Sequence, residues 1–177
     1  MNNIQDVLKI WEEEERQVRE HLASAGSVHP SELIERTGMD FFNDMFAGKL
    51  PSPPIGETLN FIPLHMENGI AVFQGRPLYQ HYNPLGTVHG GWLCTLLDSA
   101  VGCAVQSTLP QGKAFTTLEI KVNMVRALTV DVPIVRAEGK VVHSGHQVST
   151  AEGRIVGPDG KIYAHATTTC LIFDVRP

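Results

Sequence analysis

The residues with the clearest chemical potential lie in one short segment and in the apolar stretch that follows it. The segment reads Asn83-Pro84-Leu85-Gly86-Thr87-Val88-His89-Gly90-Gly91, and Asp98 comes seven residues after the second glycine. From Thr87 through Gln111, Asp98 is the single residue with an unambiguous charge. A carboxylate in a partly dry site can act as a base near neutral pH, because desolvation raises its pKa. The same spacing also fits a solvent-facing edge of a helix, and both interpretations stay open.

The glycine pair predicts a helix start that can stabilise negative charge. Gly90 and Gly91 precede the apolar stretch, so the first backbone N–H groups there lack intrahelical acceptors. The positive end of the helix dipole adds to this effect, and an anion or an oxygen that gains charge is stabilised. His89 fits either a structural hydrogen-bonding role or a base. Asn83 fits either a turn or the positioning of a water or a carbonyl.

The apolar stretch predicts a helix that is enclosed on most sides. A rotation of about 100° per residue gathers the bulky side chains on the face opposite Asp98 and leaves small side chains beside it. We expect another molecule to approach the helix along this small-residue face. The residues predicted to contact this molecule are Gly91, Thr95 and Gly102 on the helix and Thr116 on the strand that follows it.

The remaining pattern predicts an α+β layer pair. Two short strands are expected before the helix, and alternating apolar and polar residues predict four more after it, joined largely by short turns into an antiparallel meander. The sheet is expected to curl around the helix. In the first strand after the helix, alternation puts Leu118, Ile120, Val122 and Met124 on one face. The expected strand ranges are 58–64, 69–76, 116–126, 135–141, 147–156 and 162–173.

Residues 1–53 are predicted to form an N-terminal helical extension with a proline-rich linker, and residues 54–177 to form the main domain. Apolar residues from Ile4 to Leu22 recur at helical spacing among charged ones. This pattern favours an accessory amphipathic helix packed on a larger body, with a lid or a partner-binding helix as the alternative. Prolines at 51, 53 and 54 mark the boundary, because they do not fit inside a helix or a central strand.

Composition excludes several classes of protein. Hydrophobic residues make up 42% and charged residues 19% of 177 residues, as in a globular domain. A net charge of −5 gives no general attraction to nucleic acid or to an anionic membrane. The chain contains neither an apolar run of membrane-spanning length nor a signal-like start, and its three cysteines form no CxxC motif. We therefore expect a cytoplasmic protein without a bound metal, a nucleic-acid partner or a membrane partner.

The order of Asn83, His89-Gly90-Gly91 and Asp98 resembles the PaaI-like hotdog-fold acyl-CoA thioesterases of the phenylacetate-degradation type. The resemblance runs from about Pro54 to Phe173. Three other segments resemble family strands, namely 115–120, 161–164 and 167–169. The resemblance implies a hotdog fold, in which a curved antiparallel sheet of five or six strands wraps around one long central helix. It also implies homodimers, often dimers of dimers (homotetramers), with active sites between subunits and no cofactor.

The resemblance also implies roles for five residues. By correspondence, Asp98 would be the nucleophile or general base, and the Gly90 N–H would polarise a thioester carbonyl. Asn83 would hold the attacking water or the carbonyl, and His89 would shape the loop. Thr117 would supply a hydroxyl that reaches across from the partner subunit.

The resulting hypothesis is hydrolysis of an acyl-CoA thioester to free acid and CoA. The thioester carbonyl is electrophilic and a thiolate leaves readily, so the protein needs an oriented base or nucleophile and an oxyanion site. We expect Asp98 and the Gly90 amide, both on one helix, to converge on the thioester. A non-catalytic acyl-CoA binding or sensing module is the first alternative. A hotdog hydratase or dehydratase is the second, and the sequence leaves aromatic, medium-chain and short-chain acyl groups open.

Overall fold

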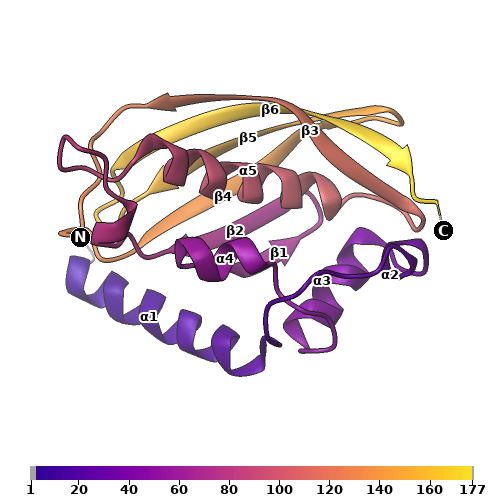
Figure 1. Ribbon diagram of the computed structural model, residues 1–177, viewed down its shortest axis with the longest axis horizontal. Helices are drawn as coiled ribbons and strands as arrows, with labels where there is room; N and C mark the ends of the chain where they lie inside the picture. Colours follow the sequence, from indigo (N-terminus) through magenta and orange to yellow (C-terminus); the bar gives the residue numbers. More distant parts are fainter. Residues whose placement is uncertain (1–2, 177) are drawn as a thin grey trace.

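The computed structural model describes residues 3–176 and contains one curved sheet wrapped around a long helix, α5 (Gly90–Gln106) (Figure 1). The six-stranded sheet has the order β1-β2-β4-β5-β6-β3, and all its neighbouring strands are antiparallel. This architecture confirms the predicted hotdog class and the enclosed central helix. The strands are β1 (Phe61–Glu67), β2 (Ile70–Gly75), β3 (Lys113–Met124), β4 (Val135–Ser144), β5 (Val148–Val156) and β6 (Ile162–Asp174).

The backbone of α5 lies directly against β4 and β5. Gly139 and Gly153 face each other across these two strands, and both point toward the helix. A Cβ atom on Gly139 would lie 2.3 Å from the carbonyl oxygen of Ala100, and one on Gly153 would lie 2.7 Å from a methyl group of Val101. No larger residue fits at these positions without displacing the helix. The inner side of α5 is therefore closed to any ligand.

Strand β3 does not follow the predicted meander. Of the four strands that follow α5, only β4, β5 and β6 lie side by side in chain order, whereas β3 pairs with β6 at the far edge of the sheet. Residues 125–134 carry the chain from this edge to β4, past the N-terminal end of α5. The four-strand meander was therefore wrong, because alternation within a strand does not specify which strand will be its neighbour.

A β-bulge interrupts β3 beside α5. The pairing of β3 with β6 shifts register between Thr117 and Glu119. As a result, odd-numbered side chains point toward the helix before the bulge and even-numbered side chains do so after it. Thr117 points toward α5, while Leu118 is 59% exposed and Ile120 packs on the core. The prediction that Leu118 and Ile120 share one face was wrong for this reason.

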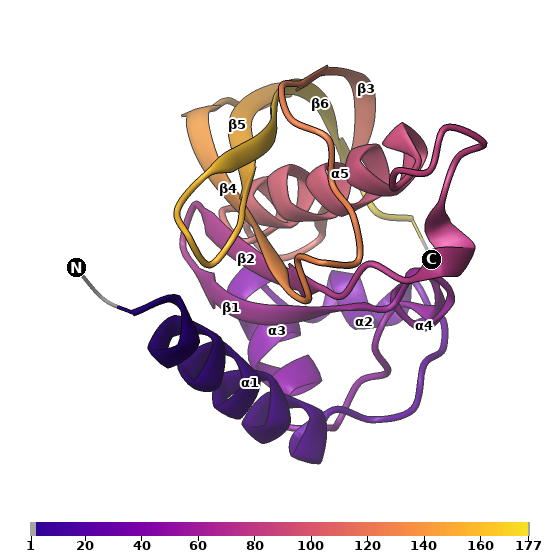
Figure 2. The same ribbon diagram turned by 90° about the vertical axis from the view of Figure 1, so that its left-hand side faces the viewer.

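Four helices come before the sheet: α1 (Ile4–His21), α2 (Ser31–Ile34), α3 (Gly38–Phe46) and α4 (Pro54–Leu59). Helix α4 takes up the first residues of the strand expected at 58–64, so β1 begins later than predicted. Pro54 is tolerated there because it stands in the first turn, where its missing N–H has no intrahelical acceptor. Helix α1 covers the outer side of β1 and β2, opposite α5 (Figure 2).

A buried carboxylate holds α1 against the sheet. Glu15 is 5% exposed and accepts hydrogen bonds from Gln74 on β2, from Arg76 and from Arg19 of its own helix, each at 2.8 Å. Burial by itself would raise the pKa of Glu15, but these hydrogen bonds and the neighbouring guanidinium charges outweigh it and hold the pKa below its ordinary value. Close by, the Arg136 guanidinium lies 4.3 Å from the ring centroid of Trp11.

We predict that Glu15→Gln weakens the docking of α1 by about 2 kcal/mol, because hydrogen bonds to a charged group are replaced by weaker ones. Hydrogen exchange of the α1 amides measures this loss, and Glu13→Gln on the exposed side of α1 is the matched control. Because the folded-state pKa is lowered, the stabilisation is present above the ordinary pKa of 4.5 and is lost as pH falls below it. Equal protection of α1 in both variants would contradict this role.

Candidate active site

Asp98 lies on the outer side of α5 and contacts β3 of its own chain. Thr117 Oγ1 donates a hydrogen bond of 2.9 Å to Asp98 Oδ1. The β-bulge aims Thr117 at the helix, and the carboxylate is half-buried. The resemblance implied that Thr117 comes from a partner subunit, but the structure places it beside Asp98 within one chain. The pair forms a carboxylate held in one orientation by a hydroxyl.

The thiols around Asp98 are poor nucleophiles. Burial and the charge of Asp98 raise the pKa of Cys94 and bring that of Cys103 to about 12. Burial also raises the pKa of Cys170, which pairs with Thr117 across the two strands. Because the thiolate is the reactive form of cysteine, these side chains stay neutral at physiological pH. Asp98 is the group in this cluster that can take a proton or attack a carbonyl.

The Gly90 amide begins α5 and has a free N–H. His89 is the N-cap residue, and its Nδ1 accepts a 2.8 Å hydrogen bond from the Gly91 N–H. The Trp92 N–H donates to the His89 carbonyl, whereas the Gly90 N–H has no acceptor among residues 3–176. An unpaired N–H at the positive end of a helix is a donor for an oxyanion. His89 thus orders the helix start and lies more than two turns from Asp98.

Asn83 organises the loop that precedes the helix. Its Oδ1 accepts from the N–H groups of Leu85 and Thr87 at 2.9 and 3.3 Å, and its Nδ2 donates to Thr87 Oγ1 at 2.9 Å. This is an Asx-type turn, in which the side chain replaces a backbone partner. Asn83 could contact a water or a carbonyl, as predicted, only through the hydrogen-bonding capacity of its side chain that this turn does not use. The principal contacts of Asn83 shape the loop.

Asn83 and Gly90 line one small cavity, which we name the amide cavity. Its volume is about 310 Å³, and its opposite wall is formed by residues 124–128. A Cβ on Gly90 would lie 2.7 Å from the sulfur of Met124, so this half-exposed side chain covers the helix start. Arg126 adds an exposed guanidinium that forms no ion pair with residues 3–176. The sequence pattern gives no sign that Met124 and Arg126 belong to this cavity, because the crossing of β3 to the sheet edge brings them here.

The Gly90 amide and the Asp98 carboxylate do not converge within one chain. They are eight residues apart on α5, which separates them by about 12 Å along the helix axis. The amide cavity accordingly contains Gly90 and lacks Asp98. The expectation that one helix presents both groups to the same thioester was wrong, because an α-helix holds such residues more than two turns apart.

The residues predicted to contact a ligand have different surroundings. Gly91 and Thr116 are exposed, and Thr95 is half-buried with its hydroxyl donating to the Gly91 carbonyl at 2.9 Å. Gly102 is buried, and a Cβ there would lie 2.8 Å from the Phe115 ring. Phe115 of β3 therefore covers Gly102, and the open part of the small-residue face ends before it.

No helix within residues 3–176 is long and apolar enough to cross a membrane. In the same part of the chain, no three His, Cys, Asp or Glu side chains are grouped so that they could hold a metal ion.

The sequence profile of the Thioesterase superfamily matches residues 85–164, which include the start of α5 and Asp98. A curated protein of Halobacterium salinarum that carries the provisional description of an esterase is 39% identical over 88 residues. That match covers 49% of this chain and 56% of the relative, so this chain spans about half the length of the relative.

Solved structures share the fold over most of the chain. A thioesterase-like, phenylacetic acid degradation-related protein of Ralstonia eutropha is 27% identical, with a TM-score of 0.68 over 73% of this chain and 98% of that one. A variant of the phenylacetic acid degradation protein PaaI of Thermus thermophilus is 29% identical, with a TM-score of 0.60 over 67% of this chain and 97% of that one. The chain belongs to the thioesterase superfamily, and the predicted PaaI-like hotdog resemblance is confirmed.

The buried His81 side chain packs against the start of α5 and accepts a hydrogen bond from the loop that precedes the helix. Its ring stacks on Trp92 at a centroid distance of 5.7 Å, and its Nδ1 accepts the Leu78 N–H at 3.0 Å. Its Nε2 is buried and lacks a partner among residues 3–176. Burial lowers the pKa of His81, and protonation would replace the acceptor at Nδ1 by a second donor. The observed hydrogen bond from Leu78 therefore requires His81 to be neutral.

We predict that His81 makes the stability of the protein pH-dependent. Since the folded-state pKa is lowered, stability is full above the ordinary histidine value of 6.5 and falls as pH drops through the folded-state pKa. His81→Asn keeps an oxygen acceptor for Leu78 and cannot titrate, so its unfolding free energy should lose less between about pH 7.5 and pH 5. Urea unfolding at several pH values measures the difference. The same pH slope in both proteins would refute the prediction.

Proposed function

We propose that the protein hydrolyses acyl-CoA thioesters, with Asp98 as the general base or nucleophile and the Gly90 amide as the oxyanion donor. The carrying observation is the free N–H of Gly90 at the start of α5, on the same helix as the Thr117-oriented carboxylate. Membership of the thioesterase superfamily supports hydrolysis of a thioester as the reaction class.

The chemistry needs only these two groups and water. Asp98 takes a proton from a water that attacks the carbonyl carbon, or attacks that carbon itself. The carbonyl oxygen gains charge that the Gly90 N–H and the helix dipole stabilise. The C–S bond then breaks, CoA leaves as a thiolate that takes up a proton, and the acid is released. In the nucleophilic route, water afterwards cleaves the acyl-aspartate.

A second copy of the chain would bring the two groups together. The separation of Gly90 and Asp98 along α5 excludes a common carbonyl within one chain. The outer edge of β3 is unpaired, and it exposes Leu118 (59%) and Met124 (50%). Unpaired edges with apolar side chains favour pairing with another strand. In the proposed homodimer, two β3 strands meet, and Gly90 of one subunit faces Asp98 of the other.

The choice of CoA as the thiol rests on Arg126. This exposed guanidinium stands at the amide cavity, although the protein is acidic overall. Guanidinium groups bind phosphate oxygens well, often through two hydrogen bonds. The phosphates of CoA would lie near Arg126 while the thioester reaches Gly90.

Asp98→Asn is predicted to lower kcat for acyl-CoA hydrolysis by at least about 10²-fold, the usual contribution of a general base. The amide oxygen of asparagine can still accept the Thr117 hydroxyl, so the fold and its melting temperature should change little. Thiol release from acyl-CoA measures the rate, and Asp131→Asn on an exposed loop is the control. Normal turnover by the Asp98 variant would disprove the role. Acyl-CoA binding without any turnover by the wild type would support the non-catalytic alternative.

Gly90→Pro removes the proposed oxyanion donor at a position where proline suits a helix start, and its ring requires only that the flexible end of the Met124 side chain shift. His89 already has extended backbone angles, φ −61° and ψ 136°, as the residue before a proline requires. We predict a loss in kcat of about 10²–10³-fold, measured by the same thiol-release assay. A variant that folds and turns over normally would show that this amide is not the oxyanion donor.

Mixing inactive Asp98→Asn and Gly90→Pro chains tests whether the site lies between subunits. A mixed dimer would contain one site with both groups intact, so refolded mixtures should regain roughly a quarter of wild-type activity under two-fold symmetry. Unmixed variants refolded alone are the controls. An absence of recovery, with mixed dimers shown to form, would show that Gly90 of one subunit and Asp98 of the other do not act at a common site.

A further inference from the structure

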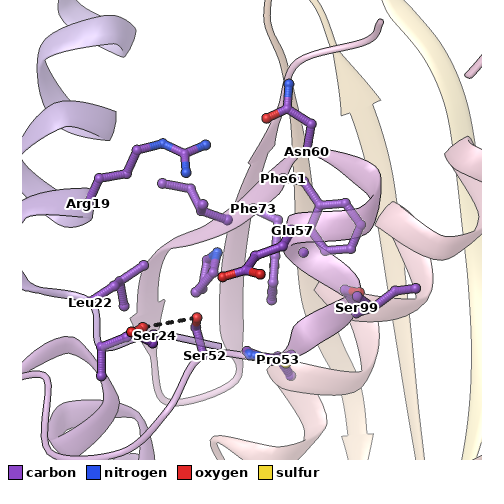
Figure 3. A pocket seen from close by; sticks show the side chains of 16 residues that line it. Arg19, Leu22, Ser24, Ser52, Pro53, Glu57, Asn60, Phe61, Phe73 and Ser99 are labelled. Carbon is purple, nitrogen blue, oxygen red and sulfur yellow. Dashed lines mark hydrogen bonds between the residues drawn. The ribbon is translucent and has the colours of Figure 1, made fainter. Parts of the chain in front are cut away.

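A second cavity lies between the N-terminal extension and the central helix, and we name it the extension cavity. Its volume is about 340 Å³, within the range of small-ligand pockets. Figure 3 shows Arg19 reaching in from α1 and Glu57 from α4, with Ser99 of α5 on the opposite side. Phe61 and Phe73, each 3% exposed, line it between these elements. The lining therefore combines apolar side chains with the charged Arg19 and Glu57 and with the uncharged polar residues Ser24, Ser52, Asn60 and Ser99.

The extension cavity is lined on α5 by Ser99 and Cys103, and Asp98 lies beside this lining without being part of it. Ser99 follows Asp98 directly, and Cys103 lies one turn further along the same side of α5 as Ser99. Burial, together with the charge of Asp98, raises the pKa of Cys103. Between Asp98 and the cavity, the helix surface carries the small side chains of Thr95 and Ser99. No bulky residue of α5 separates the two.

The outer wall belongs to the extension and is held in place. The wall is formed by the end of α1, residues 22–24 and the linker at 52–53. Ser52 donates to the Ala23 carbonyl at 3.3 Å, which joins the two parts of this wall. Arg19 is oriented by a 2.8 Å hydrogen bond from its Nε to the buried Glu15 carboxylate. The wall is thus part of the ordered structure.

We propose that the extension cavity receives the apolar acyl group of the substrate and selects its length. This inference rests on the proposed function, because it assumes that a thioester is bound beside Asp98. An acetyl group would end near Asp98, whereas a longer apolar acyl group crosses the small-residue face and enters the cavity. Burial of each additional CH₂ group is favourable. Beyond the cavity, a chain meets the charged side chains of Arg19 and Glu57, which sets an upper limit.

The test uses Ser99→Leu in the full-length protein. Leucine at this half-buried position would fill the inner end of the cavity, while Ser99→Ala leaves it open and serves as the control. For wild type, kcat/KM should rise from acetyl-CoA to octanoyl-CoA or phenylacetyl-CoA, and the preferred probe identifies the acyl class. Ser99→Leu should lower kcat/KM for the long probes at least tenfold more than it lowers kcat/KM for acetyl-CoA.

A second variant tests the outer end of the cavity. Ile55 is 43% exposed and lines the rim, so Ile55→Ala widens the cavity without removing a core side chain. We expect the length optimum to move toward longer acyl groups in this variant. An unchanged length profile in both Ser99→Leu and Ile55→Ala, with wild-type turnover intact, would overturn the cavity assignment and leave the proposed function standing.

A binding measurement separates this inference from the proposed function. Calorimetry with non-hydrolysable acyl-CoA thioethers of two to ten acyl carbons reports occupancy without turnover. If wild type hydrolyses no thioester but its affinity rises with length and Ser99→Leu removes that rise, the cavity assignment holds and the proposed reaction is wrong. Affinity that is independent of length in the wild type would overturn the cavity assignment.

Discussion

The close contact between the backbone of α5 and strands β4 and β5 is the constraint on which the rest of the structure depends. Gly139 and Gly153 leave no space for a side chain or a ligand on the inner side of the helix. Any polar group of α5 must therefore lie on its outer side, and Asp98 does. The bulge in β3 brings Thr117 to the same side. Without it, the strand would direct this hydroxyl away from the helix.

The Gly90 amide and the Asp98 carboxylate lie at different positions along α5 and have different partners. The free N–H of Gly90 exists because a helix start lacks acceptors, and it cannot be moved along the helix. Asp98 lies more than two turns further, where the hydroxyl of Thr117 is available. Under the proposed function, this separation is the physical reason for pairing two chains. The exposed edge of β3, with Leu118 and Met124, lies where such pairing would occur.

Helix α1 is coupled to the sheet through hydrogen bonds and ion pairs, whereas Phe42, Met45 and Leu50, further along the N-terminal extension, pack into the hydrophobic core. Glu15 joins α1 to Gln74 and Arg76, and it also orients Arg19 at the rim of the extension cavity. The buried carboxylate is stable only while these partners stay in place. An extension of this kind adds a wall to the fold without altering the sheet. Under the proposed function, this wall of the extension cavity would limit which acyl groups the protein accepts.

The sequence by itself determined the enclosed helix, its single carboxylate, its glycine start and the position of most strands, because hydrophobic periodicity and turn residues are local properties. The order of Asn83, Gly90 and Asp98 was enough to indicate the family. Only the tertiary structure decided that β3 pairs with β6, that a bulge aims Thr117 at Asp98, and that the Asn83 side chain is engaged in its own loop. It also brought Arg126 to the amide cavity. These features depend on contacts between distant segments, and periodicity indicates which face of a segment is apolar but not which segment covers it.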